Sequence, residues 1–283
     1  MAFMKFKKAP VMELFGTFLM VLLWAGMFRL PAQEASFVKN ADGIKVLRRF
    51  EPVPGFGIKM ANVVRLDQGS FRFETVSATA LAGKNRISVL QAILAAGEPA
   101  VMMNASFFDL ASGHPIGDFV EKGARPNNVI MVPGKFFDRI FVVYKNGSAD
   151  VLSGTEWLSD EQLSRVEYAV AGRSKWPGHS DLTNRSAVCI DKSGGVLLAA
   201  VYPVRTLEKM YDYMASEGCQ PEKTVSLDGG GSTQMAFSAG DERWTLGWER
   251  KGKNVPECHL KGGSTSKVCY RPVANFIAAF PKP

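Results

Sequence analysis

The decisive stretch of this chain is Leu227-Asp228-Gly229-Gly230-Gly231-Ser232, in which an acidic residue and three glycines follow a short apolar strand predicted over 224–227. Glycine loses more conformational entropy on folding than other residues, so three in a row indicate a sharp turn or a backbone that a ligand approaches closely. Successive free N–H groups in such a turn form a concave nest suited to phosphate or another oxyanion. We therefore predict that this segment, with the Thr233 hydroxyl beside it, is a functional centre. A plain tight turn is the alternative, and a Walker loop is excluded because no Gly-Lys-Ser/Thr follows.

A second candidate segment begins at Asn104, at the end of a short apolar run over 100–103 that we predict to be a buried strand. It reads Asn104-Ala105-Ser106-Phe107-Phe108-Asp109 and is followed by His114-Pro115-Ile116-Gly117-Asp118. A polar Asn, small residues and two aromatics in this order could form a pocket wall, with Phe107 or Phe108 facing a sugar ring. The alternative is that both phenylalanines belong to the core. His114 titrates near neutral pH, but a surface or core role is the alternative to catalysis.

A third candidate is Arg185, which opens an apolar strand directly after Asp181-Leu182-Thr183-Asn184. An arginine at a strand end can bind phosphate or carboxylate through two parallel hydrogen bonds. Taken alone, Arg185 is equally an ordinary surface charge.

In their order along the chain, these segments resemble the phosphodiester glycosidase family. That family carries Asn-Gly-Gly-Phe-Phe, a later Gly in a strand, Arg-Thr-Ala before a strand, and Leu-Asp-Gly-Gly-Gly-Ser. The corresponding residues here are Asn104-Ala105-Ser106-Phe107-Phe108, Gly117, Arg185-Ser186-Ala187 and Leu227-Asp228-Gly229-Gly230-Gly231-Ser232. The resemblance extends over residues 98–280. The chain departs from the family pattern at two places, with Ala105-Ser106 in place of Gly-Gly and Ser186 in place of Thr. The first departure crowds the backbone where the family leaves it bare.

The resemblance implies a hydrolase that cleaves the anomeric C–O bond of a sugar-1-phosphodiester. Glycosidases usually place two carboxyl groups about 5–9.5 Å apart, so Asp228 would be the first carboxylate, Asp109 or Asp118 the second, and Asn104 would orient a sugar hydroxyl or a water. The residues expected to bind the substrate or its phosphate are Arg185, Gly229, Gly230, Gly231, Ser232, Thr233, Ser106, Phe107, His114 and Gly117. No metal and no cofactor is required, although the acidic cluster could accept Ca²⁺. The expected partner is a carbohydrate or glycosyl-phosphate substrate.

Two other classes of function remain open. A non-catalytic polysaccharide-binding or envelope polysaccharide assembly protein would use the same pocket without turnover. A serine hydrolase has less support, because Gly178-His179-Ser180-Asp181-Leu182 resembles a nucleophile elbow but lacks its last Gly.

The first 32 residues read as an export signal. A basic stretch with Lys5, Lys7 and Lys8 precedes the apolar run 14–28, and Leu30-Pro31-Ala32 could serve as a cleavage site. The run is shorter than the about 20 residues of a spanning helix, so we expect a periplasmic or secreted protein. An uncleaved N-terminal membrane anchor is the alternative, because Leu30 suits the cleavage site poorly.

Charge argues against nucleic acid as a partner. Cleavage after residue 32 removes four basic residues and one acidic residue, which lowers the formal net charge from +7 to +4. A nucleic-acid-binding protein needs a clustered basic stripe with a known module, and the chain offers neither.

The four cysteines suit an oxidising compartment. Cys258 and Cys269 flank a polar, Gly-rich loop that a disulfide would close. Cys189 and Cys219 either pair or are small buried residues.

The pattern of elements predicts one α+β domain over residues 56–283, with a mixed, largely antiparallel sheet and a few flanking helices, after a loose lead-in over 33–55. Strands are predicted over 58–66, 71–77, 100–103, 141–144, 149–152, 168–171, 186–190, 196–201, 224–227 and 273–280, and helices over 87–96, 156–166 and 206–216. Thr155 and Thr206 are the expected N-caps of the last two helices.

Overall fold

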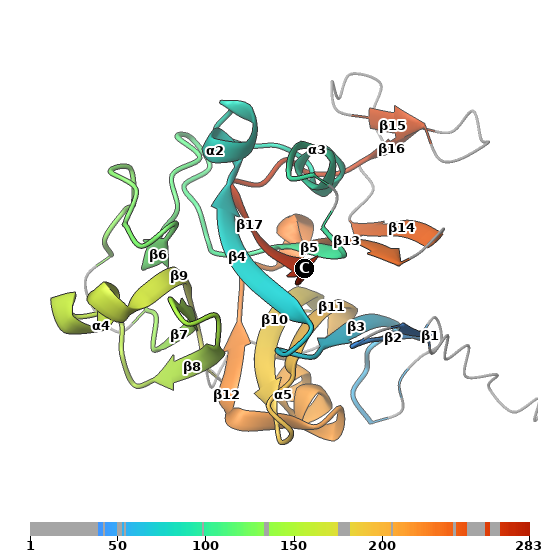
Figure 1. The fold of residues 1–283 in the computed structure, drawn as a ribbon. Helices are drawn as coiled ribbons and strands as arrows, with labels where there is room; N and C mark the ends of the chain where they lie inside the picture. The colour runs from blue at the N-terminus through green and yellow to red at the C-terminus, as the bar shows by residue number, and fades with distance from the viewer. Residues whose placement is uncertain are drawn as a thin grey trace, which may run out of the picture. The chain divides into compact units, whose positions relative to one another are not determined.

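The strand that leads into the glycine run lies at the edge of a six-stranded antiparallel sheet (Figure 1). The computed structural model describes residues 39–41, 43–49, 53, 55–97, 99–132, 136–174, 182–204, 206–239, 242–247, 258–260 and 267–283. In spatial order, the sheet contains β1 (Lys39–Ala41), β2 (Ile44–Arg49), β3 (Met60–Leu66), β11 (Val196–Val204), β10 (Thr183–Asp191) and β12 (Cys219–Ser226).

The described residues form three further antiparallel sheets. The five-stranded sheet has the order β14 (Glu242–Gly247), β13 (Gln234–Ala239), β5 (Val101–Asn104), β17 (Asn275–Pro281) and β4 (Phe71–Ser77). The four-stranded sheet has the order β6 (Phe119–Val120), β9 (Val166–Gly172), β7 (Arg139–Tyr144) and β8 (Ala149–Ser153), and β15 (Cys258–Leu260) pairs with β16 (Lys267–Cys269). Every named strand pair among the described residues is antiparallel, so the predicted α+β class is confirmed, with the strands distributed over several sheets.

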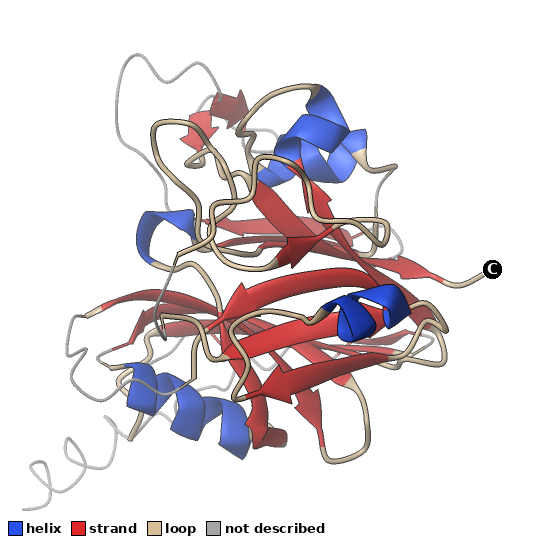
Figure 2. Ribbon diagram, turned by 90° about the vertical axis from the view of Figure 1, so that its left-hand side faces the viewer, coloured by secondary structure: helices blue, strands red, loops and turns tan. Residues whose placement is uncertain are grey.

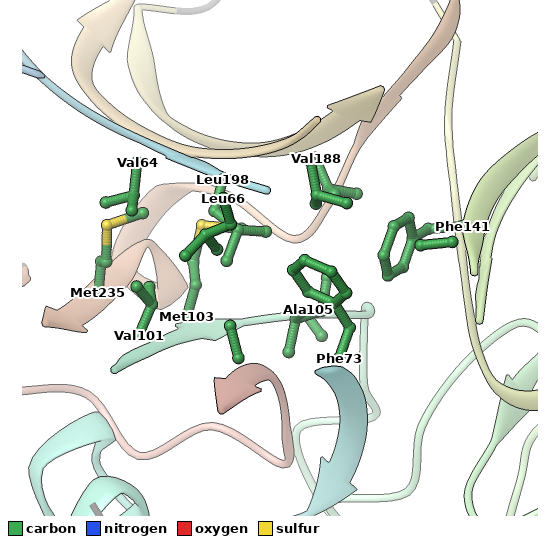
Figure 3. Close-up of a cluster of buried hydrophobic side chains, with 14 of the residues drawn as sticks. Val64, Leu66, Phe73, Val101, Met103, Ala105, Phe141, Val188, Leu198 and Met235 are labelled. Carbon is green, nitrogen blue, oxygen red and sulfur yellow. The ribbon is translucent and has the colours of Figure 1, made fainter. Parts of the chain in front are cut away.

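The main core lies between the six-stranded and five-stranded sheets. In Figure 3, Val64, Val188 and Leu198 of the first sheet face Val101 and Met103 of the second. The four-stranded sheet closes the side of this core with Phe141 of β7 (Figure 3). Because each of these three sheets turns one apolar face to the same cluster, the ends of their strands are held in fixed relative positions.

Helices cover the outer faces of the two large sheets (Figure 2). The described residues contain α2 (Ala78–Ala82), α3 (Val89–Ala95), α4 (Asp160–Arg165) and α5 (Leu207–Ser216), of which α4 leads directly into β9 of the four-stranded sheet. Ala92 of α3 packs on the five-stranded sheet, and Met210 and Met214 of α5 pack on the six-stranded sheet.

Helix α5 begins after the predicted cap Thr206, but the cap predicted for α4 is wrong. Ser159 caps α4, because its hydroxyl accepts from the Gln162 N–H at 3.2 Å and the Gln162 side chain accepts from the Ser159 N–H at 2.9 Å. This reciprocal capping box starts the helix one turn later than Thr155 would.

The segment 33–55, predicted to be a loose lead-in, contains β1 and β2. Ile44 and Val46 are buried in the main core, with exposed Lys45 between them. This alternation is the two-residue period of a strand, and it extends the six-stranded sheet.

A disulfide joins Cys189 of β10 to Cys219 at the start of β12, which decides between the two interpretations of this pair. Cys258 and Cys269 are register partners in the β15–β16 hairpin. Residues 1–32, with the predicted export signal, lie outside the described residues. Among the residues that are described, no helix has both the length and the apolar composition needed to cross a bilayer.

Candidate active site

The glycine run forms the crossover between the two large sheets. Leu227 still donates from its N–H to the Ser186 carbonyl of β10 at 2.9 Å, whereas the next residue, Asp228, donates to the Ala105 carbonyl after β5 at 3.0 Å. A 3₁₀ turn over Gly230–Ser232 then leads into β13 of the five-stranded sheet. Gly230 has a φ of +61°, a conformation that favours glycine. The predicted sharp turn is therefore present, and Asp228 stands at its first corner.

Asn104 holds this crossover in place. Its side-chain N–H donates to the Asp228 carbonyl at 2.7 Å, and its side-chain oxygen accepts from the Ser186 hydroxyl at 2.7 Å and from the Gln234 N–H at 3.0 Å. The side chain is buried, so these three bonds connect β5, β10 and β13 in a medium where hydrogen bonds are strong. Asn104 therefore positions the turn, a role different from the predicted orientation of a sugar hydroxyl.

The Asp228 side chain is partly buried, and the pKa of its carboxyl is shifted. Burial raises the pKa of Asp228 to about 6, against the opposing effects of a hydrogen bond from Ser232, the positive charge of Arg271 and the Gly229 N–H. Such a carboxyl is ionised at neutral pH and accepts a proton readily. A titratable group with a pKa near the working pH is a functional-site candidate.

Arg185 lies against the first glycine of the turn. A Cβ built on Gly229 would stand 2.7 Å from the Asn184 carbonyl oxygen and 3.6 Å from Cδ of Arg185. The absence of a side chain at Gly229 therefore permits the turn to pack directly on the start of β10. Asn104 and Arg185 therefore both contact the turn that begins at Asp228.

A second arginine, Arg173, joins Arg185 and was not predicted from the sequence. Arg173 follows β9 and exchanges two backbone hydrogen bonds of 2.9 Å with Ser226, two residues before Asp228. Its guanidinium carbon lies 3.2 Å from the ring centre of Phe136 and 5.3 Å from that of Phe107. Burial and the neighbouring charge of Arg185 lower the pKa of Arg173 to about 10. Two cations thus lie close together behind the start of the glycine turn.

A third arginine, Arg271, lies at the other end of the turn and was also missed. A Cβ on Gly231 would stand 3.3 Å from both Cδ and Nη1 of Arg271. The position just before a strand, which singled out Arg185, applies equally to Arg271 before β17, so the sequence held a usable signal.

Asp118 and Asp109 are the two residues predicted as candidates for the second catalytic carboxylate, and neighbouring groups bind both of them. The Asp118 side chain is fully buried, accepts from two nitrogens of Arg125 at 2.6 and 3.0 Å, and accepts from the Leu158 N–H at 2.7 Å. Asp109 accepts from the Ser112 N–H and hydroxyl at 2.6 and 2.7 Å, and these bonds lower the pKa of Asp109. Both carboxylates therefore hold local structure, which argues against the predicted catalytic roles.

The remaining predicted binding residues make contacts within the protein. The Ser106 hydroxyl donates to the Phe107 carbonyl at 2.7 Å, and Thr233 is fully buried. Phe107 lies 5.3 Å from the guanidinium carbon of Arg173, and Phe108 lies 6.0 Å from that of Arg271. His114 belongs to the turn that Asp109 closes, since its carbonyl accepts from the Asp109 N–H at 2.9 Å.

Gly117 has a steric reason to be glycine. Its φ is +87°, and a Cβ there would stand 2.5 Å from a ring carbon of buried Phe137. We expect Gly117→Ala to lower the free energy of unfolding by about 3 kcal/mol, from left-handed strain and overpacking together. Gly147→Ala is the matched control, because its φ is +84° with no atom within 4 Å of the added Cβ, and about 1 kcal/mol of strain is expected. Equal losses for the two variants in urea unfolding would contradict the steric explanation.

Known proteins resemble this chain in sequence and in fold. The phosphodiester glycosidase family profile matches residues 98–280, which is well over half of the chain. The chain belongs to this family. No curated protein matched the sequence.

Solved structures similar to this family member show the same fold at low sequence identity. The catalytic domain of zebrafish N-acetylglucosamine-1-phosphodiester alpha-N-acetylglucosaminidase, auto-inhibited by its pro-peptide, aligns with a TM-score of 0.55 and 14% identity over 88% of this chain and 87% of that one. A Synechocystis protein named as hypothetical gives 0.54 and 12% over 86% and 63%. A Burkholderia pseudomallei protein named as exported gives 0.50 and 13% over 78% and 74%.

The departure of this chain from the family's Gly-Gly is explained by the core. Ala105 is fully buried, and its methyl group points into the main core between the sheets (Figure 3). The Ser106 hydroxyl donates within the loop, to the Phe107 carbonyl at 2.7 Å. The two side chains therefore support the loop from within, and the predicted crowding of the site does not follow from them.

Proposed function

We propose that this chain hydrolyses a sugar-1-phosphodiester and that Asp228 and Arg185 carry the reaction. The observation that supports this most is the Asp228 carboxyl, with its pKa raised by burial, at the corner of a glycine turn that packs on Arg185. Arg173 adds a second positive charge beside Arg185. Paired guanidinium groups and free backbone N–H groups are suited to a phosphate.

The chemistry proposed needs one carboxylate. The bond between the anomeric carbon and the phosphate oxygen breaks, and its electron pair stays on the phosphate. A water oxygen bonds to the anomeric carbon, and Asp228, ionised at neutral pH, takes the proton of that water. Because the leaving phosphate is already an acid anion, it does not need the general acid of ordinary glycosidases. This agrees with the structural roles of Asp109 and Asp118.

The proposal is tested with a panel of sugar-1-phosphodiesters in water enriched in ¹⁸O. We expect the label in the released sugar, because the C–O bond breaks, and a slower reaction for Arg185→Ala. Label in the phosphate would assign the protein to P–O cleavage and reject this mechanism. Binding of the glycans without turnover of any diester would favour the polysaccharide-binding alternative.

We further propose that the protein works outside the cytoplasm. The Cys189–Cys219 disulfide supports this, because such bonds persist in oxidising compartments. The basic and apolar pattern of residues 1–32 supports it too, as does the exported name of the Burkholderia relative. Fractionation of cells producing the full chain is expected to recover it outside the cytoplasm, and recovery in the cytosol would reject the proposal.

A further inference from the structure

Asn62 is a polar residue on the core-facing side of the six-stranded sheet. It lies in β3 between Met60 and Val64 in the alternation of the strand, and both of these side chains pack in the main core. The Asn62 side chain is fully buried, and within the described part of the chain neither the oxygen nor the nitrogen of its carboxamide has a hydrogen-bonding partner. Leaving a buried amide unpaired is costly, so such groups nearly always bind protein or ordered water.

A second polar group of this kind belongs to Thr233, at the end of the glycine turn. Thr233 has extended backbone angles and stands two residues before Met235, whose side chain lies in the main core. Because side chains of an extended segment alternate between its two faces, Thr233 points toward the six-stranded sheet as Met235 does. Its side chain is fully buried, and its hydroxyl likewise finds no hydrogen-bonding partner among the described residues.

Tyr202 of β11 connects the places of these two groups. Its hydroxyl donates to the Thr233 carbonyl at 2.6 Å. Asn62 pairs with Ala200 in the register of β3 and β11, so Tyr202, two residues further along β11, is the diagonal neighbour of Asn62 on the same face. The Cβ atoms of such diagonal neighbours lie about 7 Å apart. Ala200 has a short side chain, so polar groups of both sheets meet around a small residue directly behind the turn.

We propose that a buried water molecule binds at this position and bridges the Asn62 carboxamide to the Thr233 hydroxyl, with the Tyr202 hydroxyl oxygen as a further partner. A buried water typically makes about three hydrogen bonds to groups that would otherwise be unpaired. Water fits this site because it both donates and accepts, as the carboxamide and the hydroxyls do. Burial raises the pKa of Tyr202, so its hydroxyl stays neutral, and these side chains offer no charge to an ion.

The bridge attaches the end of the glycine turn to the six-stranded sheet. Thr233 directly follows the Gly230–Ser232 turn, and its carbonyl is held by Tyr202. The water holds the Thr233 side chain to β3, the neighbour of β11 in the sheet. The start of β13 is thereby fixed through both the main chain and the side chain of one residue. This role is independent of the reaction proposed above, since it applies equally to a turn that only binds a ligand.

The test is a double-mutant cycle measured by urea unfolding at pH 7.5. Asn62→Leu and Thr233→Val roughly keep the size of each side chain and remove its hydrogen bonds to the water. We expect each to raise the unfolding equilibrium constant about tenfold, because the group left behind loses its bridge. The double variant is expected to show about the same tenfold rise, since residues that share a partner are not additive.

Thr79→Val is the control for additivity. The Thr79 hydroxyl is exposed and donates to the Lys84 carbonyl at 3.4 Å, in contact with none of these groups. Its effect on the unfolding constant is expected to multiply with that of Asn62→Leu, as for independent sites.

The water is also detectable in the wild type without any substitution. With ¹⁵N labelling, the Asn62 carboxamide protons are expected to show a nuclear Overhauser effect to a long-lived water, whereas those of exposed Asn146 are not. An Asn62 carboxamide without this signal would overturn the proposal. So would an Asn62→Leu protein more stable than the wild type, or a double variant whose loss equals the product of the single losses.

Discussion

Replacing Asp228 with Asn is expected to lower kcat/KM by about a thousandfold or more, because the proposed base is lost while the shape of the side chain is kept. The measurement is hydrolysis of the best diester of the panel at pH 7.5, with circular dichroism as a check of the fold. The backbone contacts of the turn remain, since the Asn104 side chain binds the Asp228 carbonyl and not its carboxyl. A variant with full activity would remove Asp228 from the mechanism.

The same substitution has an expected signature in stability. Burial raises the pKa of Asp228 to about 6, above its ordinary value of 3.8, so the folded state holds the proton more tightly than the unfolded chain. Ionisation therefore costs stability, which is lost as the pH rises from about 4 to about 6. A neutral Asn avoids that cost, so Asp228→Asn is expected to melt no lower than the wild type at pH 7.5. Its melting temperature should also vary less between pH 4 and 6.

Wild-type kcat/KM is expected to fall below about pH 6 for the same reason, because protonated Asp228 cannot accept a proton from water. A profile that stays flat down to pH 4 would contradict the role of Asp228 as the base. Burial of the ionised Asp228 carboxylate thus lowers the stability of the fold at neutral pH. The same burial gives the carboxyl a pKa suited to catalysis, as is common at active sites.

The sequence predicted those parts of the site that depend on local order. Asn104 ends a buried strand, Arg185 lies near the start of another, and Asp228 precedes a glycine run that only a sharp turn accommodates. Such signals lie within a few residues of one another, so no knowledge of strand pairing was needed to find them.

Arg173 and Arg271 depend instead on tertiary structure. Arg173 reaches the site because its backbone pairs with Ser226 at the end of β12, an arrangement between strands distant in the chain. Arg271 reaches it because the Gln234 side chain binds its carbonyl. Neither pairing can be read from the residues next to these arginines, and only the position of Arg271 ahead of a predicted strand was a local signal. The capping box Ser159–Gln162, by contrast, is a local pattern that the sequence itself shows.

Asp118 is a residue for which the sequence predicted the wrong kind of role. Its place directly after Gly117 suggested a catalytic carboxylate, but its contacts in the structure are those of a structural ion pair. Its fully buried carboxylate accepts hydrogen bonds from two nitrogens of Arg125 and from the N–H of Leu158, a residue that precedes α4. Asp118→Asn removes the negative charge opposite a partly buried guanidinium. We expect it to lower the free energy of unfolding by about 3 kcal/mol, because breaking a buried ion pair from one side leaves the other charge uncompensated.

The experiment that separates the two roles pairs urea unfolding at pH 7.5 with kinetics on the folded protein. Asp109→Asn makes the same chemical change at a partly exposed turn where Asn can replace Asp, and little loss of stability is expected. If Asp118 is structural, folded Asp118→Asn keeps most of its kcat/KM while its unfolding midpoint falls, the opposite of Asp228→Asn. A kcat/KM lost as completely as in Asp228→Asn, at unchanged stability, would restore Asp118 as the second catalytic carboxylate. Asp118 would then act as a proton donor, although a phosphate leaving group does not require one.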